Sequence, residues 1–410
     1  MTIHSKKIAI FCDSRKESGG EYQHLLYTIE NIKKHNKENL KFLIICTSKK
    51  LNLNLEDENL EIHYFSMNAI ERYVCYLRNF GPLVRRLKKY FFIKNKFESF
   101  LKKINVDLVY FTSPSQYSLY LEDIRFLITV PDVDHRIDGE FPEVTGRSEY
   151  QRKDEIFQKS LPRAIAVITN AEILKRRLNY IFGVQNDRIY IINLKPARSV
   201  NNFKNIDPSK QKKIRENLNL PRNYLFYPAM YLPHKNHKNL IDALKILRSE
   251  LKKDIKIVFS GSDIGYLNNL KKYSSSLKLD DCITFLNFVD DDYLPYLYLD
   301  AFAVIFPVLI GPTFCPPWEG FKMKIPVIFS ELEGVKDVYG DAVHYIKQPL
   351  EANNIANGIK KIIEDKELRK KLITNGNAKL IEIEEKNEYK QIFEIINKYR
   401  KLQKTWKFNN

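Results

Sequence analysis

The chain has 410 residues, of which 44% are hydrophobic and 12% aromatic, enough for two packed domains of roughly 200 residues each. This composition excludes a largely disordered chain. Lys and Arg outnumber Asp and Glu by 67 to 50, and the net charge of +17 favours polyanions, anionic lipids or phosphorylated small molecules as partners, although a lysine-rich composition by itself explains the same excess.

In the first half of the chain, short apolar runs alternate with amphipathic stretches. Runs of four to seven apolar residues separated by helical segments are typical of parallel strands joined by crossover helices. We therefore predict a helix over residues 19–35 and strands over residues 7–13, 40–48, 106–113, 126–132 and 164–170.

A polar segment interrupts this alternation at residues 195–223, which contain three prolines and no long apolar run. The alternation then resumes, with predicted strands over residues 224–230, 255–261, 282–289, 301–307 and 325–330. We predict a first domain over residues 1–198, a linker around a short helix over residues 199–222, and a second domain over residues 223–385. We predict a further helix over residues 386–410, which is a candidate to pack back on the first domain.

The predicted fold class is α/β, with two doubly wound, Rossmann-like parallel sheets that face a cleft. Ligands of such sheets bind at the carboxyl ends of the strands. The five cysteines lie far apart, which argues against a disulfide framework and a zinc site. The amino-terminal apolar run is too short for a signal peptide, and no stretch reaches the roughly 20 apolar residues of a membrane span. We therefore expect a cytoplasmic protein.

Two stretches carry candidate binding chemistry. In YPAMYLPHKNHKNLIDAL, Lys235 lies in the turn before a helix, where its ammonium and the helix amino terminus suit a diphosphate; a solvated turn is the alternative. In VLIGPTFCPPWEGFKMKIPVIFS, two prolines start a helix after a turn that leaves the backbone N–H groups of Thr313, Phe314 and Cys315 free for a ligand. Glu319, about one turn inside this helix, offers a carboxylate to ribose hydroxyls, unless it is a solvated surface residue.

In this order and spacing, the two stretches resemble the donor domain of the retaining GT-B glycosyltransferases of family 4 (group 1). The segment PPWEGFKMKIPVIFSELEGVKDVYGDAVHYIKQ resembles the signature of that family, and IANGIKKIIEDKELRKKLITNG continues the similarity. A weaker similarity runs through SGGEYQHLL, TVPDVDHRIDGEFPEV and AIAVITNAEILKRRLNYIFGV in the first half. The resemblance covers most of the chain and says nothing about which sugar is transferred.

The resemblance implies roles for individual residues. Lys235 would bind the donor diphosphate, Glu319 the ribose, and the Gly311 loop with Thr313, Phe314 and Cys315 the sugar or its phosphates. The other implied positions are Gly19 and Gly20 in a loop approaching the donor, Asp132 and His135 as catalytic residues beside the transferred sugar and acceptor, and Phe288 and Val289 near the nucleobase.

The sequence departs from the family pattern at two positions. Gly311 stands where members often carry a second Glu, eight residues before Glu319, and Met230 replaces an arginine five residues before Lys235. The first change removes a carboxylate that would contact sugar hydroxyls, and the second removes part of the positive charge facing the diphosphate. Activity is therefore less directly implied than fold.

The implied reaction is the transfer of a sugar from a nucleotide-diphosphate sugar (GDP- or UDP-activated, for example mannose) with retention of configuration, in the hexosyltransferase class EC 2.4. No cofactor is required, since a lysine and a helix amino terminus stabilise the charge on the leaving diphosphate. Only the DVD triplet at residues 132–134 suggests a metal, and we interpret it as a turn lining the cleft.

Residues 78–103 hold nine basic residues and one acidic residue among aromatic side chains. This pattern suits a peripheral site on an anionic membrane surface, or an ordinary amphipathic helix packed on the sheet.

We expect an enzyme that extends a surface glycan (lipopolysaccharide, O-antigen or capsule) on a glycan or lipid-linked acceptor. A nucleic-acid-binding role, a silent GT-B scaffold and a sugar-nucleotide epimerase are the alternatives, and no nucleic acid is expected as the partner.

Overall fold

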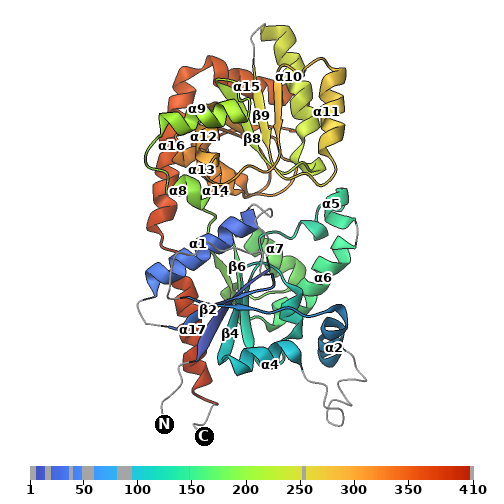
Figure 1. The fold of residues 1–410 in the computed structure, drawn as a ribbon, viewed down its shortest axis with the longest axis vertical. Helices are drawn as coiled ribbons and strands as arrows, with labels where there is room; N and C mark the ends of the chain where they lie inside the picture. The colour runs from blue at the N-terminus through green and yellow to red at the C-terminus, as the bar shows by residue number, and fades with distance from the viewer. Residues whose placement is uncertain are drawn as a thin grey trace.

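The structure is a computed structural model that describes residues 6–13, 20–36, 40–48, 60–80, 95–146, 148–251 and 255–406. Gly19 and most of the basic segment 78–103 lie outside these ranges. Two α/β domains stand one above the other, and helices cover both sheets (Figure 1).

In the part of the chain that the structure describes, the first sheet has seven strands in the order β3-β2-β1-β4-β5-β6-β7, and every pairing is parallel. The strands are β1 (Lys7–Cys12), β2 (Phe42–Cys46), β3 (Glu61–Tyr64), β4 (Val106–Phe111), β5 (Arg125–Thr129), β6 (Ala166–Thr169) and β7 (Ile189–Ile191). The surrounding helices are α1 (Gly20–His35), α2 (Ala69–Phe80), α4 (Lys96–Lys103), α5 (Pro142–Thr145), α6 (Glu149–Ser160) and α7 (Glu172–Phe182), with short turns η2 (Gln116–Tyr120), η3 (Asp134–Arg136), η4 (Leu161–Arg163) and η5 (Asn186–Arg188).

Within the same ranges, the second sheet has six parallel strands in the order β10-β9-β8-β11-β12-β13. The strands are β8 (Tyr224–Pro228), β9 (Ile257–Ser260), β10 (Ile283–Leu286), β11 (Ala301–Phe306), β12 (Val327–Ser330) and β13 (Val343–Ile346). The helices are α8 (Arg198–Asn201), α9 (Pro208–Asn217), α10 (His237–Leu251), α11 (Leu267–Ser276), α12 (Leu294–Leu299), α13 (Cys315–Lys322), α14 (Val335–Tyr339), α15 (Ala352–Glu364), α16 (Lys366–Glu385) and α17 (Lys390–Gln403), with turns η6 (Pro233–Lys235) and η7 (Gly340–Ala342).

The central strands form because their residues are apolar on both faces. β2 and β12, for example, are buried at every position, as expected for parallel strands covered by helices on both sides. The sequence analysis did not predict β3, β7 and β13, which all lie at sheet edges. These edge strands are three or four residues long and carry partly exposed polar or aromatic side chains, so their apolar runs are short or interrupted. The expected two-domain α/β fold is confirmed.

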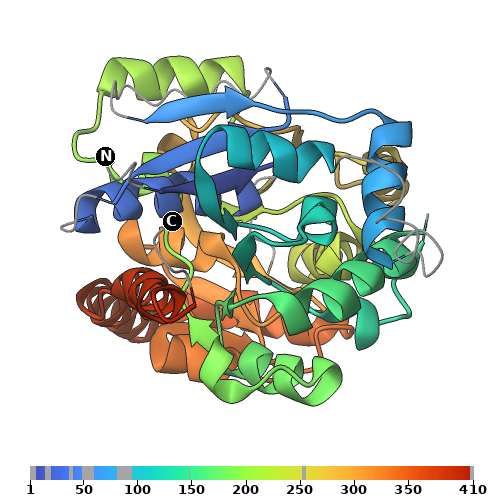
Figure 2. The same ribbon diagram turned by 90° about the horizontal axis from the view of Figure 1, so that it is seen from below.

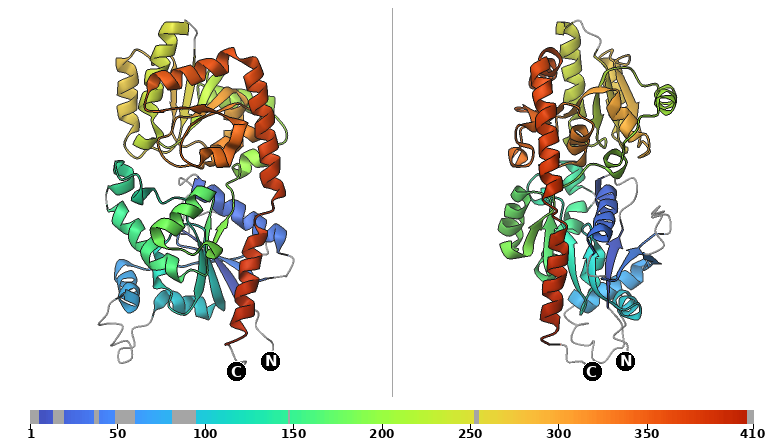
Figure 3. Two further views of the ribbon diagram at one scale, coloured as in Figure 1. Left: turned by 180° about the vertical axis from the view of Figure 1, so that it is seen from behind. Right: turned by 90° about the vertical axis from the view of Figure 1, so that its left-hand side faces the viewer.

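The chain crosses between the domains twice, on the same side of the molecule. The first crossing precedes α8, and the second follows α16, which continues into α17 beside the first sheet (Figure 3). Glu388 accepts a hydrogen bond from the backbone N–H of Asn193 at 2.7 Å, which fixes the start of α17 to the segment after β7. Seen from below, α17 and α2 lie at opposite sides of the first domain (Figure 2).

The predicted linker region contains two helices rather than one, because α8 and α9 both form there. α9 belongs to the second domain by its contacts: Ile214 is buried, and Arg215 forms a two-pronged ion pair with Asp300 at 2.6 Å. All five cysteines are buried and carry free thiols. None of the helices in the described ranges is long and apolar enough to cross a membrane.

The packing of α17 generates a stability prediction. Ile396 is fully buried in a core cluster with residues of β1, β2 and β4, whereas Leu402 on the same helix is 49% exposed. Ile396→Ala should lower the free energy of unfolding by about 2–5 kcal/mol, because it leaves a cavity in this core. Leu402→Ala, the matched control, should change it by less than about 0.5 kcal/mol. Urea denaturation followed by circular dichroism measures both, and equal effects would contradict the packing described.

Candidate active site

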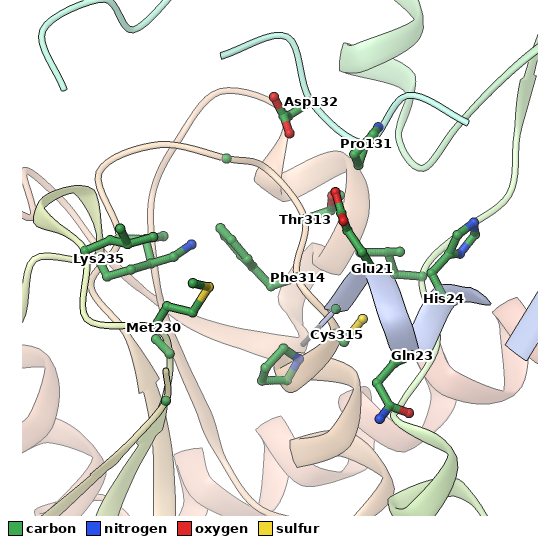
Figure 4. A pocket seen from close by; sticks show the side chains of 18 of the residues that line it. Glu21, Gln23, His24, Pro131, Asp132, Met230, Lys235, Thr313, Phe314 and Cys315 are labelled. Carbon is green, nitrogen blue, oxygen red and sulfur yellow. The ribbon is translucent and has the colours of Figure 1, made fainter. Parts of the chain in front are cut away.

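A cavity of about 670 Å³ lies between the carboxyl ends of the two sheets. Both domains contribute to its wall, so neither domain forms the site alone (Figure 4). Most residues predicted from the sequence lie on this wall: Gly20, Asp132, Lys235, Phe288, Val289, Gly311, Thr313, Phe314, Cys315 and Glu319.

His135 does not face the cavity, and this corrects the expectation for it. The residue is 1% exposed. The centroid of its ring lies 5.0 Å from that of the Phe157 ring and 6.0 Å from that of the Phe182 ring. Consecutive side chains in the turn η3 point in different directions, so Asp134 reaches the cavity wall while His135 points into the first domain. Burial lowers the pKa of His135, which favours the neutral ring.

The lysine loop between β8 and α10 is fixed from several directions. Asn236 has a left-handed backbone (φ 60°), and its amide donates to the carbonyls of Pro307 at 2.9 Å and Pro349 at 2.6 Å. The Tyr227 hydroxyl donates to the Lys235 carbonyl at 2.7 Å. The second histidine, His237, is fully buried against the rings of Tyr227 and Tyr231 and belongs to the core rather than to the site.

Lys235 projects into the cavity beside the ring of Phe314 (Figure 4). Its Nζ lies 3.9 Å from the ring centroid, and its ammonium forms no hydrogen bond or ion pair with any residue in the described ranges. Burial lowers the pKa of Lys235 to about 8, while Asp134, Asp132 and Glu143 act in the opposite direction. An ammonium in this setting is poised to accept an anionic partner.

The loop that begins at Gly311 forms another part of the cavity wall. Gly311 has a left-handed backbone (φ +91°), and a Cβ at this position would lie 2.8 Å from Cζ of Phe314. A glutamate at position 311 would therefore need both a different backbone and a different position for the Phe314 ring. Met230, the other departure from the family pattern, lies on the cavity wall near Lys235 (Figure 4).

The expectation of three free backbone N–H groups in this loop needs correction. The N–H of Phe314 donates to the hydroxyl of Tyr339 at 3.1 Å, and the same hydroxyl lies 3.3 Å from the Phe314 carbonyl. No hydrogen bond joins the N–H of Thr313 or of Cys315 to the described part of the chain. Cys315 begins α13 and is followed by two prolines, which have no N–H, so its own N–H is the one that this helix start presents to a ligand.

Glu319 lies on the cavity wall and is only 3% exposed. Its carboxylate accepts hydrogen bonds from the Tyr298 hydroxyl at 2.5 Å and from the backbone N–H of Ala197 at 3.1 Å. Burial raises its pKa to about 7 in spite of both bonds. Glu319 therefore connects α13 with the segment that crosses between the domains.

The sequence analysis missed several groups that the first domain contributes to the wall, including Glu21, His24 and Lys153. Lys153 lies 3.4 Å from a carboxylate oxygen of Asp132. Burial and the neighbouring Asp132 raise the pKa of Asp134 to about 7. Asp134 belongs to the DVD turn that the sequence analysis expected along the cleft, whereas Lys153 lies on α6 in a stretch that carries no motif.

Among the described residues, four hydrogen bonds join the first domain to loops of the second domain that line the cavity. Glu143 of α5 accepts from both the backbone N–H (2.9 Å) and the ring Nδ1 of His234. Thr313 donates its hydroxyl to Asn170 at 3.0 Å, and Gln23 donates its amide to Asp291 at 2.9 Å. The domains are thus in contact on both sides of the cavity.

The described residues contain no cluster of three or more His, Cys, Asp or Glu side chains arranged to bind a metal ion. Asp132 and Asp134 both lie on the cavity wall.

Comparisons with known proteins agree with this geometry. Residues 209–379 match the sequence model of the family described as "Glycosyl transferases group 1". The chain is 24% identical over 237 residues to O-antigen chain mannosyltransferase B of Escherichia coli (56% of this chain, 61% of that protein) and 27% identical over 191 residues to O-antigen chain mannosyltransferase RfbU of Salmonella typhimurium (47% and 49%). The alignments thus span about half to three fifths of these curated relatives.

Among solved structures, Anabaena Alr3699/HepE in complex with UDP and glucose superposes with a TM-score of 0.70 at 18% identity, over 96% of this chain and all of that one. At this identity the likeness shows the fold, which is the GT-B arrangement predicted from the sequence. The match of residues 209–379 to this family model supports the predicted enzyme class, EC 2.4.

The raised pKa of Glu319 makes stability depend on pH. Its pKa rises from 4.5 when unfolded to about 7 when folded, so its contribution is fully present below pH 4.5 and is lost as the pH rises through 7. Between pH 4.5 and pH 8.5 the wild type should lose about 3 kcal/mol of unfolding free energy relative to Glu319→Gln, because one pKa unit corresponds to about 1.4 kcal/mol. Denaturant titrations across this range test it, and parallel pH profiles for the two proteins would contradict it.

Proposed function

We propose that the protein is a glycosyltransferase of the hexosyltransferase type (EC 2.4) that transfers a sugar from a nucleotide-diphosphate sugar, with retention of configuration, to a glycan or lipid-linked acceptor. The observation that carries this proposal is the ammonium of Lys235, which has no ion-pair partner in the described part of the chain and lies in a cavity between the carboxyl ends of two parallel sheets. Such a cation is unfavourable without an anion, and the diphosphate of a donor supplies one.

The donor would lie mainly on the second domain. Its diphosphate would contact Lys235 and the N–H of Cys315, and its nucleoside would lie toward Phe288, Val289 and Glu319 on the same wall. Binding of the diphosphate favours the charged form of Lys235, whose pKa of about 8 already leaves most of it protonated at pH 7. GDP- and UDP-activated hexoses, mannose among them, are the first donors to test, since the relatives named above are mannosyltransferases and HepE was solved with UDP.

The first domain would hold the acceptor. In the transfer step, the leaving diphosphate gains negative charge, which Lys235 and the start of α13 stabilise without reorganisation. Asp132, the catalytic residue we retain on the acceptor side, would receive a hydrogen bond from the acceptor and is oriented by Lys153 at 3.4 Å. The reaction requires no cofactor and no metal in this scheme.

Surface polysaccharide synthesis is the proposed setting, because the relatives named above act on O-antigen chains. A cytoplasmic enzyme at the inner face of the membrane fits such a role. The basic segment 78–103 would supply the contact with anionic lipid.

A charge substitution tests the donor site. Lys235→Ala should weaken the binding of UDP or GDP roughly 10- to 100-fold, since a hydrogen bond to a charged group contributes about 1.5–3 kcal/mol. Lys238→Ala is the matched control: Lys238 lies three residues further along, in the first turn of α10, but it is exposed and pairs with Asp242 at 3.2 Å. The Lys238→Ala variant should bind UDP and GDP with the same affinity as the wild type. Isothermal titration calorimetry measures both.

A thermal-shift screen of the wild type against nucleoside diphosphates and their sugar conjugates precedes this comparison. A ligand at 100 times its dissociation constant stabilises the native state by about 2.7 kcal/mol, which raises the melting temperature visibly. Binding without turnover would indicate a silent scaffold, consistent with Gly311 and Met230. The absence of any shift, together with salt-dependent binding to oligonucleotides, would replace the proposal with a polyanion-binding role.

A further inference from the structure

The contact between Lys235 and Phe314 is unusually close for a cation and an aromatic ring. The ammonium nitrogen lies 3.9 Å from the ring centroid, well within the roughly 6 Å over which the negative face of a ring attracts a cation. In the ranges that the structure describes, Lys235 forms no hydrogen bond or ion pair. The ring face is therefore the partner that the protein itself gives this ammonium.

The Phe314 ring is fixed in this position by its surroundings. Its backbone N–H and carbonyl both meet the hydroxyl of Tyr339, which is fully buried. Cζ of the Phe314 ring lies 2.8 Å from the position that a Cβ of residue 311 would take. The centroids of the Phe314 and Phe329 rings are 5.9 Å apart. Gly311 and Phe314 are thus matched, because the space taken by the ring is open only when residue 311 is a glycine.

Other charged groups face the lysine without pairing with it. Asp132, which lies just before η3, Asp134 in η3 and Glu143 in α5 favour its charged form from across the cavity. Its neighbours His234 and His237 are neutral near pH 7, since burial lowers their pKa values to about 4 and about 3. The first domain therefore contributes long-range attraction, while Phe314 contributes the direct contact.

On this basis, and resting on the proposed function, we propose that Phe314 is a positioning residue for the donor diphosphate. Its ring keeps the Lys235 ammonium charged and directed into the cavity, at a site where Gly311 and Met230 provide no charged group. The oxygens of the diphosphate would then approach the side of the ammonium that the ring leaves open. The ring acts on the donor through the lysine.

A double-mutant cycle separates this role from simple packing. Affinities for UDP and GDP are measured by isothermal titration calorimetry in the wild type, Phe314→Leu, Lys235→Ala and the double variant. Phe314→Leu should weaken binding roughly 10- to 30-fold when Lys235 is present, since a desolvated contact of this type is worth about that factor. In the Lys235→Ala background the same change should alter affinity less than about 3-fold.

Phe329→Leu is the control for the loss of a buried ring. Phe329 neighbours Phe314 but does not contact Lys235, so its change should lower the melting temperature while nucleotide affinity stays at the wild-type value. The melting temperatures of the Phe314 variants, measured in parallel, show that the titrated proteins are folded.

The pH profile gives a second readout that packing alone would not change. Wild-type affinity should fall as Lys235 loses its proton near pH 8. In Phe314→Leu the fall should begin at lower pH, because the charged form has lost the ring that stabilised it.

Equal loss of affinity from Phe314→Leu in both backgrounds, or an unchanged pH profile, would overturn this inference and leave the proposed function intact. A wild-type protein that binds no nucleoside diphosphate would overturn the proposed function itself.

Discussion

The site depends on one constraint: the Lys235 ammonium, where the two domains meet, has no counter-ion among the residues that the structure describes. Desolvating such a charge is costly, so the surrounding structure has to hold it in place and compensate for it. The backbone of the lysine loop is tied down by Asn236 and Tyr227, and three carboxylates of the first domain face the ammonium from across the cavity. These groups favour the charged form of the lysine, which suits the binding of an anion.

This constraint also explains why the site needs both domains. The second domain supplies the lysine and the start of α13, but the groups that favour the charged lysine come from the segment between β5 and η3, from η3 and from α5 of the first domain. Glu319 adds a second connection, because its carboxylate holds the N–H of Ala197 in the segment between the domains. A change in the relative position of the domains therefore alters the electrostatic environment of the cavity as well as its shape.

The sequence was sufficient to predict the central strands and the two loops of the second domain, for a physical reason. Buried parallel strands need continuous apolar runs, and a lysine before a helix or a double proline at its start is a local feature of the chain. The edge strands β3, β7 and β13 were missed because they need no such run. The contacts of Phe314 with Lys235 and Tyr339 were unpredictable because they join positions far apart in sequence. The direction in which His135 points depends on the geometry of a three-residue turn, which the residue pattern does not encode.

The two chain crossings, before α8 and after α16, lie on one side of the molecule (Figure 3). Two covalent connections on one side favour a hinge rotation of one domain relative to the other, about the line that joins the two connections. Glu143 of α5 meets His234, beside Lys235, at the part of the domain interface that lies away from these connections. A bulky sugar nucleotide would therefore enter and leave at that part of the interface, and each passage would break and remake the bonds between one carboxylate and one histidine.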